Sequence, residues 1–146
     1  MLSKEYIAGL FDGEGHVSIT VTQRRGQTDP KLCVKLTNTH LPVMDMVKDQ
    51  YGGVYYIPRK IKNHYLQVYQ LSLNVTESKR FLTEMLPYLV IKKRQAELAL
   101  EFSNTIYRRG KKPVTAEEKQ LREELMIKMR EEKSKEWIQQ RQLIGK

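Results

Sequence analysis

The sequence lacks the features of disulfide-bonded, thiol-ligated and membrane-spanning proteins. Cys33 is the single cysteine among 146 residues, which excludes an intramolecular disulfide and a cage of cysteines around a metal. No apolar run approaches the roughly 18 residues that span a bilayer, and no hydrophobic segment typical of a signal peptide follows Met1. We therefore expect a soluble, intracellular protein without a membrane partner, in the cytoplasm or an organelle.

Acidic residues are also in short supply. The chain has 17 Asp and Glu against 26 Lys and Arg, which gives a net charge of +9. Such an excess favours a polyanionic partner, with nucleic acid first and an anionic membrane surface second. The length suits one domain with a substantial core and leaves little room for a second.

An unusual helix is predicted at the start of the chain, over residues 6–15. Ser3 can cap its beginning, and Gly15 suits a left-handed residue after its end. Gly9 and Gly13 lie four residues apart on one face, although a glycine inside a helix costs about 1 kcal/mol relative to alanine. Close backbone contact with another helix would compensate for that cost. The alternative interpretation is a simple turn ending in Asp-Gly-Glu-Gly, since one pair of small residues is weak evidence.

The remaining elements follow from changes in hydrophobic period. We expect strands within 16–40 joined by a turn at 26–30, a helix at 41–51, and strands at 54–59 and 64–73 with a bulge near Tyr69. Helices at 75–86 and 91–107 follow, then a basic linker at 108–113 and a helix from 115 to about 133 or beyond. The order predicts an α+β fold, α-β-β-α-β-β-α, over residues 1–107. The basic helical extension at 108–146 is expected to pack on the same domain.

The predicted strands have one apolar face and one polar, basic face. Regions 16–40 and 53–74 contain seven Lys and Arg but one acid, Asp29. Polar and basic side chains on a two-stranded ribbon suit base edges and phosphates in the DNA major groove. Lysine and threonine also keep exposed strands soluble, so the pattern alone leaves both interpretations open. The candidate DNA-binding residues are Ser18, Thr20, Thr22, Arg24, Arg25, Lys31, Cys33, Lys35, Tyr55, Arg59, Lys60, Lys62, His64, Gln67 and Tyr69.

The decapeptide itself carries a family resemblance. The run Ile7-Ala8-Gly9-Leu10-Phe11-Asp12-Gly13-Glu14-Gly15 resembles the LAGLIDADG motif of homing endonucleases, with Glu14 in place of the more usual Asp and Gly13 in place of Ala. The resemblance covers roughly residues 3–107, and the motif occurs once. It implies a saddle of antiparallel strands lying in the DNA major groove. It also implies an intron-encoded type of enzyme that cuts both strands of a long, near-palindromic site and leaves 3′ overhangs.

Glu14 is the candidate metal ligand because Mg²⁺ prefers carboxylate oxygens and phosphodiester hydrolysis needs a metal to activate water. One carboxylate at the negative end of a helix makes a weak site, so two copies of the motif helix are expected to bring two Glu14 side chains together. The metal site is expected at Glu14 and Gly13, with Mg²⁺ as cofactor and Mn²⁺ or Ca²⁺ able to substitute for binding. The dimer interface is expected at Ala8, Gly9, Asp12 and Gly13.

The resemblance suggests two further catalytic positions. A polar residue at the end of the second strand orders water in the family, and its match is Asn38. A basic residue that stabilises charge near the scissile phosphate matches Lys92, with Lys93 and Arg94 as neighbours. His16 is expected to be a strand-start residue, and no general-base role is assigned to it. Asp12 is expected to accept hydrogen bonds from backbone near the helix end in preference to binding metal.

Three functions remain open on this sequence. The first is a homodimeric, metal-dependent endonuclease acting on double-stranded DNA. The second is a maturase that uses the same fold to bind intron RNA, and the third is a DNA-binding regulator that no longer cleaves. Glu14 favours the first, because loss of the catalytic acid would be expected in the other two.

Overall fold

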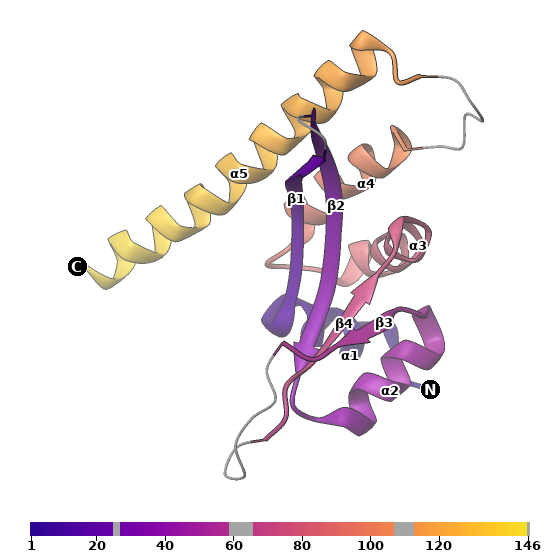
Figure 1. The fold of residues 1–146 in the computed structure, drawn as a ribbon. Helices are drawn as coiled ribbons and strands as arrows, with labels where there is room; N and C mark the ends of the chain where they lie inside the picture. Colours follow the sequence, from indigo (N-terminus) through magenta and orange to yellow (C-terminus); the bar gives the residue numbers. More distant parts are fainter. Residues whose placement is uncertain (25–26, 59–65, 107–112, 146) are drawn as a thin grey trace.

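The computed structural model describes residues 1–24, 27–58, 66–106 and 113–145 (Figure 1). The elements in chain order are α1 (Lys4–Glu14), β1 (Gly15–Arg24), β2 (Gln27–Asn38), α2 (Leu41–Tyr51), β3 (Val54–Tyr56), β4 (Tyr69–Leu73), α3 (Val75–Met85), the 3-10 turn η1 (Leu86–Tyr88), α4 (Lys93–Asn104) and α5 (Ala116–Ile144). The α+β class and the predicted element order are confirmed. The predicted linker at 108–113 lies almost entirely outside the described residues.

The sheet is antiparallel, with the strand order β1-β2-β4-β3. In the β1–β2 hairpin Val17 pairs with Val34 and Ile19 pairs with Leu32, so the apolar positions of the two strands share one face as predicted. The strands extend further than expected, because β2 already begins at Gln27. Residues 27–30, predicted as part of the turn, therefore belong to the ladder.

The helix N-termini follow the capping rules. The Ser3 side chain accepts a hydrogen bond from the Tyr6 amide at the start of α1. Complete capping boxes begin α3 at Asn74 and α5 at Thr115, as their sequences predict. These local contacts fix where each helix starts, and α1 therefore presents one defined face to the core.

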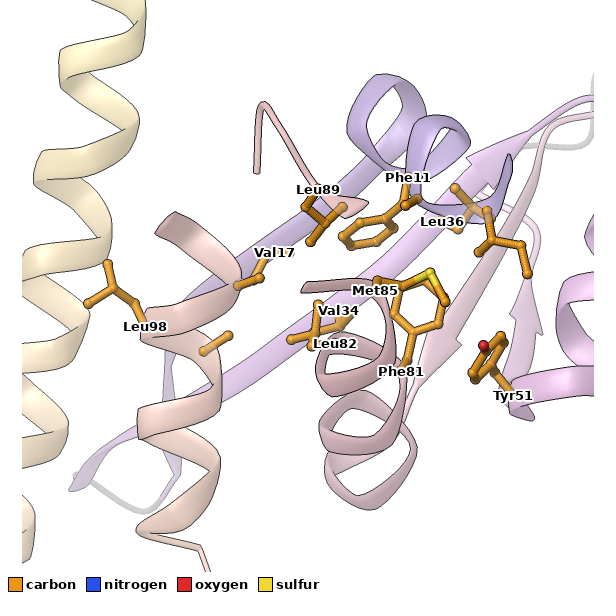
Figure 2. Packing of buried hydrophobic residues seen from close by; sticks show 14 of the residues in the cluster. Phe11, Val17, Val34, Leu36, Tyr51, Phe81, Leu82, Met85, Leu89 and Leu98 are labelled. Atoms are coloured by element: carbon orange, nitrogen blue, oxygen red, sulfur yellow. The ribbon is translucent and has the colours of Figure 1, made fainter. Parts of the chain in front are cut away.

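An aromatic cluster joins α1 to α2 and α3. The Phe11 and Phe81 rings meet edge to face with their centroids 5.0 Å apart, and Tyr51 meets Phe81 at the same separation. Figure 2 shows Met85 and Leu82 of α3 beside these rings, with Val17 and Val34 of the sheet facing them. The C-terminal half of α1 is thus held against both the sheet and α3.

Gly15 differs from its predicted conformation. Its φ of −83° and ψ of 164° are extended, because β1 begins there without an intervening turn. The need for glycine is spatial: a Cβ at this position would lie 2.5 Å from the Phe11 carbonyl oxygen and would also strike the Phe11 ring. The left-handed prediction is therefore wrong, although the choice of residue still has a physical reason.

A Gly15→Ala substitution should consequently destabilise the protein by about 1–3 kcal/mol, because the added methyl group must displace a packed ring or the helix end. Urea unfolding of the two proteins measures the difference. Asp49→Ala, at an exposed position of α2, is the control. Equal midpoints for Gly15→Ala and the parent would contradict the steric explanation.

The second strand pair is shorter than predicted. β4 pairs with β2 without interruption from Tyr69 to Leu73, so the expected bulge near Tyr69 is absent and β4 begins five residues later than expected. β2 ends at Asn38, opposite Tyr69, and offers no partner to residues before it. Leu66, which precedes β4, is accordingly 75% exposed.

The C-terminal extension packs on the body through α5. Leu125 and Met129 are buried in the common core, as their helical spacing predicts, whereas Leu121 is largely exposed. The Arg122 guanidinium is also buried and donates hydrogen bonds to the Thr105 hydroxyl (3.0 Å) and carbonyl (2.8 Å) after α4. None of the helices in the described ranges has an apolar stretch long enough to cross a membrane.

Candidate nucleic-acid interface and carboxylate site

The polar face of the sheet is defined by strand register. Residues of β1 and β2 that alternate with the buried valines and leucines face away from the helices, and β4 and β3 continue this face through their own alternating positions. By this register the described residues on it are His16, Ser18, Thr20, Thr22, Asp29, Lys31, Cys33, Lys35, Thr37, Val54, Tyr56, Gln70 and Ser72. This polar sheet face includes most of the first-hairpin residues predicted from the sequence.

Access to the predicted first-hairpin residues is uneven. Thr20 and Lys31 are exposed and pair across β1 and β2. Ser18 is 8% exposed and its hydroxyl lies 2.9 Å from the His16 Nε2 atom, so it is less available than the alternation alone suggests. Cys33, opposite Ser18, is half-buried. The accessible part of the hairpin therefore begins at Thr20.

Two of the tyrosines proposed as DNA contacts lie on the opposite face. Tyr55 pairs with the buried Leu71, and its hydroxyl donates a hydrogen bond to Asp45 of α2 (2.7 Å). Tyr69 is two residues from Leu71 and therefore lies on the same face of β4. Its ring meets that of Tyr55 edge to face with centroids 6.1 Å apart. The placement of both on the polar sheet face is therefore wrong, and the bulge expected near Tyr69 does not form.

Besides His16, Asp29 and Thr37 of the hairpin, the DNA-binding prediction missed three polar residues that β3 and β4 contribute to the polar sheet face. Gln70 and Ser72 of β4 and Tyr56 of β3 lie on it, and Tyr56 is 59% exposed. The sequence does indicate the position of Gln70 and Ser72. They alternate with Leu71 and Leu73, so if the two leucines face inward, Gln70 and Ser72 face outward. Gln67 lies before β4, where its side chain donates to the Val68 carbonyl (3.0 Å).

The remaining DNA-binding predictions cannot be placed. The backbone of Arg24 ends β1. Arg25, Arg59, Lys60, Lys62 and His64 lie outside the described residues.

Glu14 lies exposed at the C-terminal end of α1, where the chain enters β1. Gly15 pairs with Leu36, and the next pair, His16 with Lys35, opens the polar sheet face. Glu14 therefore lies at the edge of this face, two residues before the pair of His16 with Lys35.

His16 is neutral at physiological pH in this environment. Partial burial, followed by the charges of Lys133, Lys35 and Lys92, lowers its pKa to about 4. These three lysines come from α5, from β2 and from the turn before α4, so positive charge from three elements converges where β1 begins. The site can attract an anion such as a phosphate.

Lys92 is brought to the end of α1 by Asp12. The Asp12 carboxylate accepts hydrogen bonds from the backbone amides of Val90 (2.8 Å) and Lys92 (2.9 Å), and the Lys92 ammonium donates to the Asp12 carbonyl (2.5 Å). The cation thus lies at the negative end of the helix, one turn or less from Glu14. Arg94, its alternative, instead pairs with Glu97 at 3.2 Å.

Asn38 is engaged elsewhere. It lies two residues after the inward-facing Leu36 and so on the same face of β2. Its side-chain oxygen accepts a hydrogen bond from the His40 amide (2.9 Å) at the junction of β2 and α2. That contact orders the chain reversal and separates Asn38 from the polar sheet face. The structure does not support placing Asn38 with Glu14.

The four predicted interface residues of α1 divide into two pairs. Ala8 is fully buried in the core, and Asp12 is 9% exposed with both carboxylate oxygens engaged within the protomer. Neither side chain is available to a second helix, so their assignment to an interface is corrected. Gly9 and Gly13 are exposed, and a Cβ on either would meet nothing within 4 Å.

The LAGLIDADG-like domain family matches residues 2–86, which is more than half of the chain. The match includes α1, the whole sheet and α3. This chain is a member of the LAGLIDADG-like family. No curated protein matches it.

Solved structures share the fold of this LAGLIDADG protein. The archaeal intron-encoded homing endonuclease I-Vdi141I, complexed with DNA, is 19% identical with a TM-score of 0.71, and the match covers 88% of this chain and 82% of that one. The homing endonuclease I-CvuI, in complex with the I-CreI target and 2 mM Mg with DNA not cleaved, is 18% identical with a TM-score of 0.65 over 85% and 80%. The homing endonuclease I-TnaI is 16% identical, with a TM-score of 0.64 over 90% and 85%.

Proposed function

We propose that this LAGLIDADG protein is a homodimeric, site-specific endonuclease that hydrolyses both strands of DNA with Mg²⁺. Two features of α1 carry the proposal together. One face of the helix is open at Gly9 and Gly13, and Glu14 is exposed where the helix ends, at the edge of the polar, basic sheet face. The DNA complexes and the Mg in the structures of similar fold support the same assignment.

The dimer is proposed to form across Gly9 and Gly13. Since a glycine in mid-helix carries a cost, open space above both residues favours a second helix that packs backbone to backbone. Tyr6 is 51% exposed on the same face, and Val90 is 83% exposed next to Asp12 on its flank. A two-fold axis here would bring two Glu14 carboxylates together.

The residues present fit a hard divalent cation. Glu14 offers exposed carboxylate oxygens, the donor type that Mg²⁺ prefers, and a second Glu14 would complete a shared site. Within one protomer's described residues no group of three or more His, Cys, Asp or Glu side chains is close enough to hold a metal. Bound Mg²⁺ would supply an activated water and stabilise the leaving oxygen.

The lysines would act on the phosphate itself. Lys92 is fixed by Asp12 at the end of α1, and Lys35 lies across from His16 on the polar sheet face. Both can offset the charge that builds on the scissile phosphate, with little reorganisation because their backbones are held by the sheet and by Asp12. The preorganised amine is Lys92, whose position depends on a buried carboxylate.

Selection of cleaved sites from a randomised DNA library tests the function. With Mg²⁺ we expect near-palindromic sites whose products carry 3′ overhangs. Specific binding without cleavage would instead identify a regulator, and absence of both would overturn the proposal.

Gly13→Ala should separate folding from dimerisation. In the protomer the added methyl group meets nothing within 4 Å and improves helix propensity, so the monomer should gain up to about 1 kcal/mol. At a helix–helix contact the same methyl group costs about 1–3 kcal/mol, which weakens the dimer by about 5-fold to 150-fold. Sedimentation equilibrium measures the dimer, with Thr83→Ala on the exposed face of α3 as the control. An unchanged dimer constant would exclude Gly13 from the interface.

A further inference from the structure

Asp29 is the one acidic residue in the strand regions at 16–40 and 53–74. It pairs with Thr22 toward the outer end of the β1–β2 hairpin, and the register places it on the polar sheet face. Its side chain is 62% exposed. A carboxylate there repels DNA phosphates, so it weakens binding to every sequence unless it makes a favourable contact with one of them.

Arg122 of α5 lies beside this carboxylate. The distance from its Nη1 atom to the Asp29 Oδ1 atom is 3.9 Å, although the Arg122 side chain is only 11% exposed. The other guanidinium nitrogens are engaged at the end of α4, where Nε donates to the Thr105 hydroxyl (3.0 Å) and Nη2 to the Thr105 carbonyl (2.8 Å). Burial and these two hydrogen bonds fix the position of the cation next to Asp29.

The helix α5 brings Arg122 to this place because it packs on both strands of the hairpin. Figure 1 shows α5 crossing β1 and β2 near the end where the two strands are joined. Leu125 and Met129, about one and two turns after Arg122, are each 1% exposed and anchor the helix in the core. The position of Arg122 against the hairpin is therefore set by packing within the protomer.

The ion pair leaves the carboxylate able to accept a hydrogen bond from a further donor. Its separation is longer than a hydrogen bond, and it involves one of the two oxygens. An ionised carboxylate only accepts hydrogen bonds, and in the major groove cytosine offers only the donor amine N4. Guanine and thymine present acceptor oxygens, and adenine has an acceptor nitrogen beside its amine, so each of them suits a carboxylate less well than cytosine does.

We propose that Asp29 selects a cytosine in each half of the DNA target, with Arg122 as the positioning residue that holds its carboxylate. The inference rests on the proposed function and adds a base preference to it. Neither residue is among the DNA contacts predicted from the sequence, and Arg122 lies outside the family match at residues 2–86. The C-terminal helix thus takes part in recognition without touching the DNA.

The register also predicts where this cytosine lies. Thr22, the partner of Asp29, is seven residues beyond Gly15 in β1, which corresponds to roughly 23 Å at about 3.3 Å per residue. Duplex DNA has one base pair per about 3.4 Å of its axis. We therefore expect the cytosine about six to eight base pairs outward from the base pair nearest to Glu14.

Selection of cleaved sites from the randomised library tests the role of Asp29. At the expected position the parent should favour cytosine over the other bases by about fivefold or more. Asp29→Asn should favour adenine there, because a carboxamide bonds both N6 and N7 of adenine. Asp49→Asn is the matched control, since it makes an equal charge change at an exposed position of α2, and it should keep the parent preference.

Arg122→Met and Arg122→Lys test the positioning role in the same selection. The methionine variant should lose most of the cytosine preference at this position alone, and the lysine variant, which keeps the charge, should recover part of it. Arg122→Met should also melt earlier, because Thr105 loses two donors, so the selection is run well below its melting temperature. A merely structural role would lower the melting temperature and leave the base preference unchanged.

The outcomes separate this inference from the proposed function. Continued selection of cytosine by Asp29→Asn, or a parent without a base preference at this position, would overturn the inference and leave the proposed function intact. A folded Arg122→Met protein with the parent preference would overturn the role of Arg122. A parent protein that selects no site at all would overturn the proposed function instead.

Discussion

Replacing Glu14 with Gln should abolish DNA cleavage and leave DNA binding intact. The amide keeps the size of the side chain but removes the negative charge that would hold a divalent cation at the end of α1. Metal stabilisation of phosphodiester hydrolysis is worth several kcal/mol, so we expect the single-turnover cleavage rate to fall by about 10³-fold or more. Binding should persist because Glu14 contributes no positive charge to the interface.

The matched control is Glu5→Gln on the same helix, at an exposed position in the first turn of α1. It removes an equal charge more than two turns from Glu14, so cleavage should stay near the parent rate. Calorimetry of Ca²⁺ binding to the protein–DNA complex should show loss of metal affinity in Glu14→Gln alone. If Glu14→Gln cleaves as fast as Glu5→Gln, the metal site lies elsewhere.

Features set by neighbouring residues could be predicted from the sequence. Ser3, Asn74 and Thr115 each accept a hydrogen bond from an amide three residues ahead, and such caps are visible in the sequence. The β1–β2 hairpin is likewise local, since alternation alone determines that Val17 and Val34 share a face. Helix capping and strand alternation together predict that Glu14 lies at the edge of the polar sheet face.

Features set by distant partners could not be predicted. The faces of Tyr55 and Tyr69 depend on where β2 ends, because the register of β4 is decided by pairing with Asn38 and Leu36. A one-residue change in that register moves every side chain of the strand to the other face. Ala8 illustrates the same limit, since a small residue on a helix is equally suited to a tight core and to an external contact.

The sequence predicts that Asp12 accepts hydrogen bonds from backbone, and it does, but its partners lie 78 and 80 residues away and could not be predicted. The motif helix and the turn before α4 are joined by this single carboxylate. Its two amide contacts hold the backbone that carries Lys92, and Lys92 in turn donates to the Asp12 carbonyl. The residue therefore links the family motif to a basic group that lies outside the matched segment.

Asp12→Ala should accordingly be the most destabilising single substitution considered for α1. It leaves the amides of Val90 and Lys92 without their acceptor, and each charge-assisted bond is worth about 1.5–3 kcal/mol. We expect a loss of about 3 kcal/mol or more and a melting temperature lower by about 10 °C. Cleavage should fall further than DNA binding, because Lys92 loses its fixed position while the sheet keeps its contacts.

Two further variants serve as controls for Asp12→Ala. Asp12→Asn retains one acceptor but turns an amide donor toward a backbone N–H, so its melting temperature should fall between those of the parent and Asp12→Ala. Asp49→Ala removes an exposed aspartate from α2 and should change stability by less than about 0.5 kcal/mol. If Asp12→Ala melts with Asp49→Ala, the carboxylate does not brace the turn. If it melts early but cleaves at the parent rate when folded, the bracing is structural and Lys92 takes no part in the reaction.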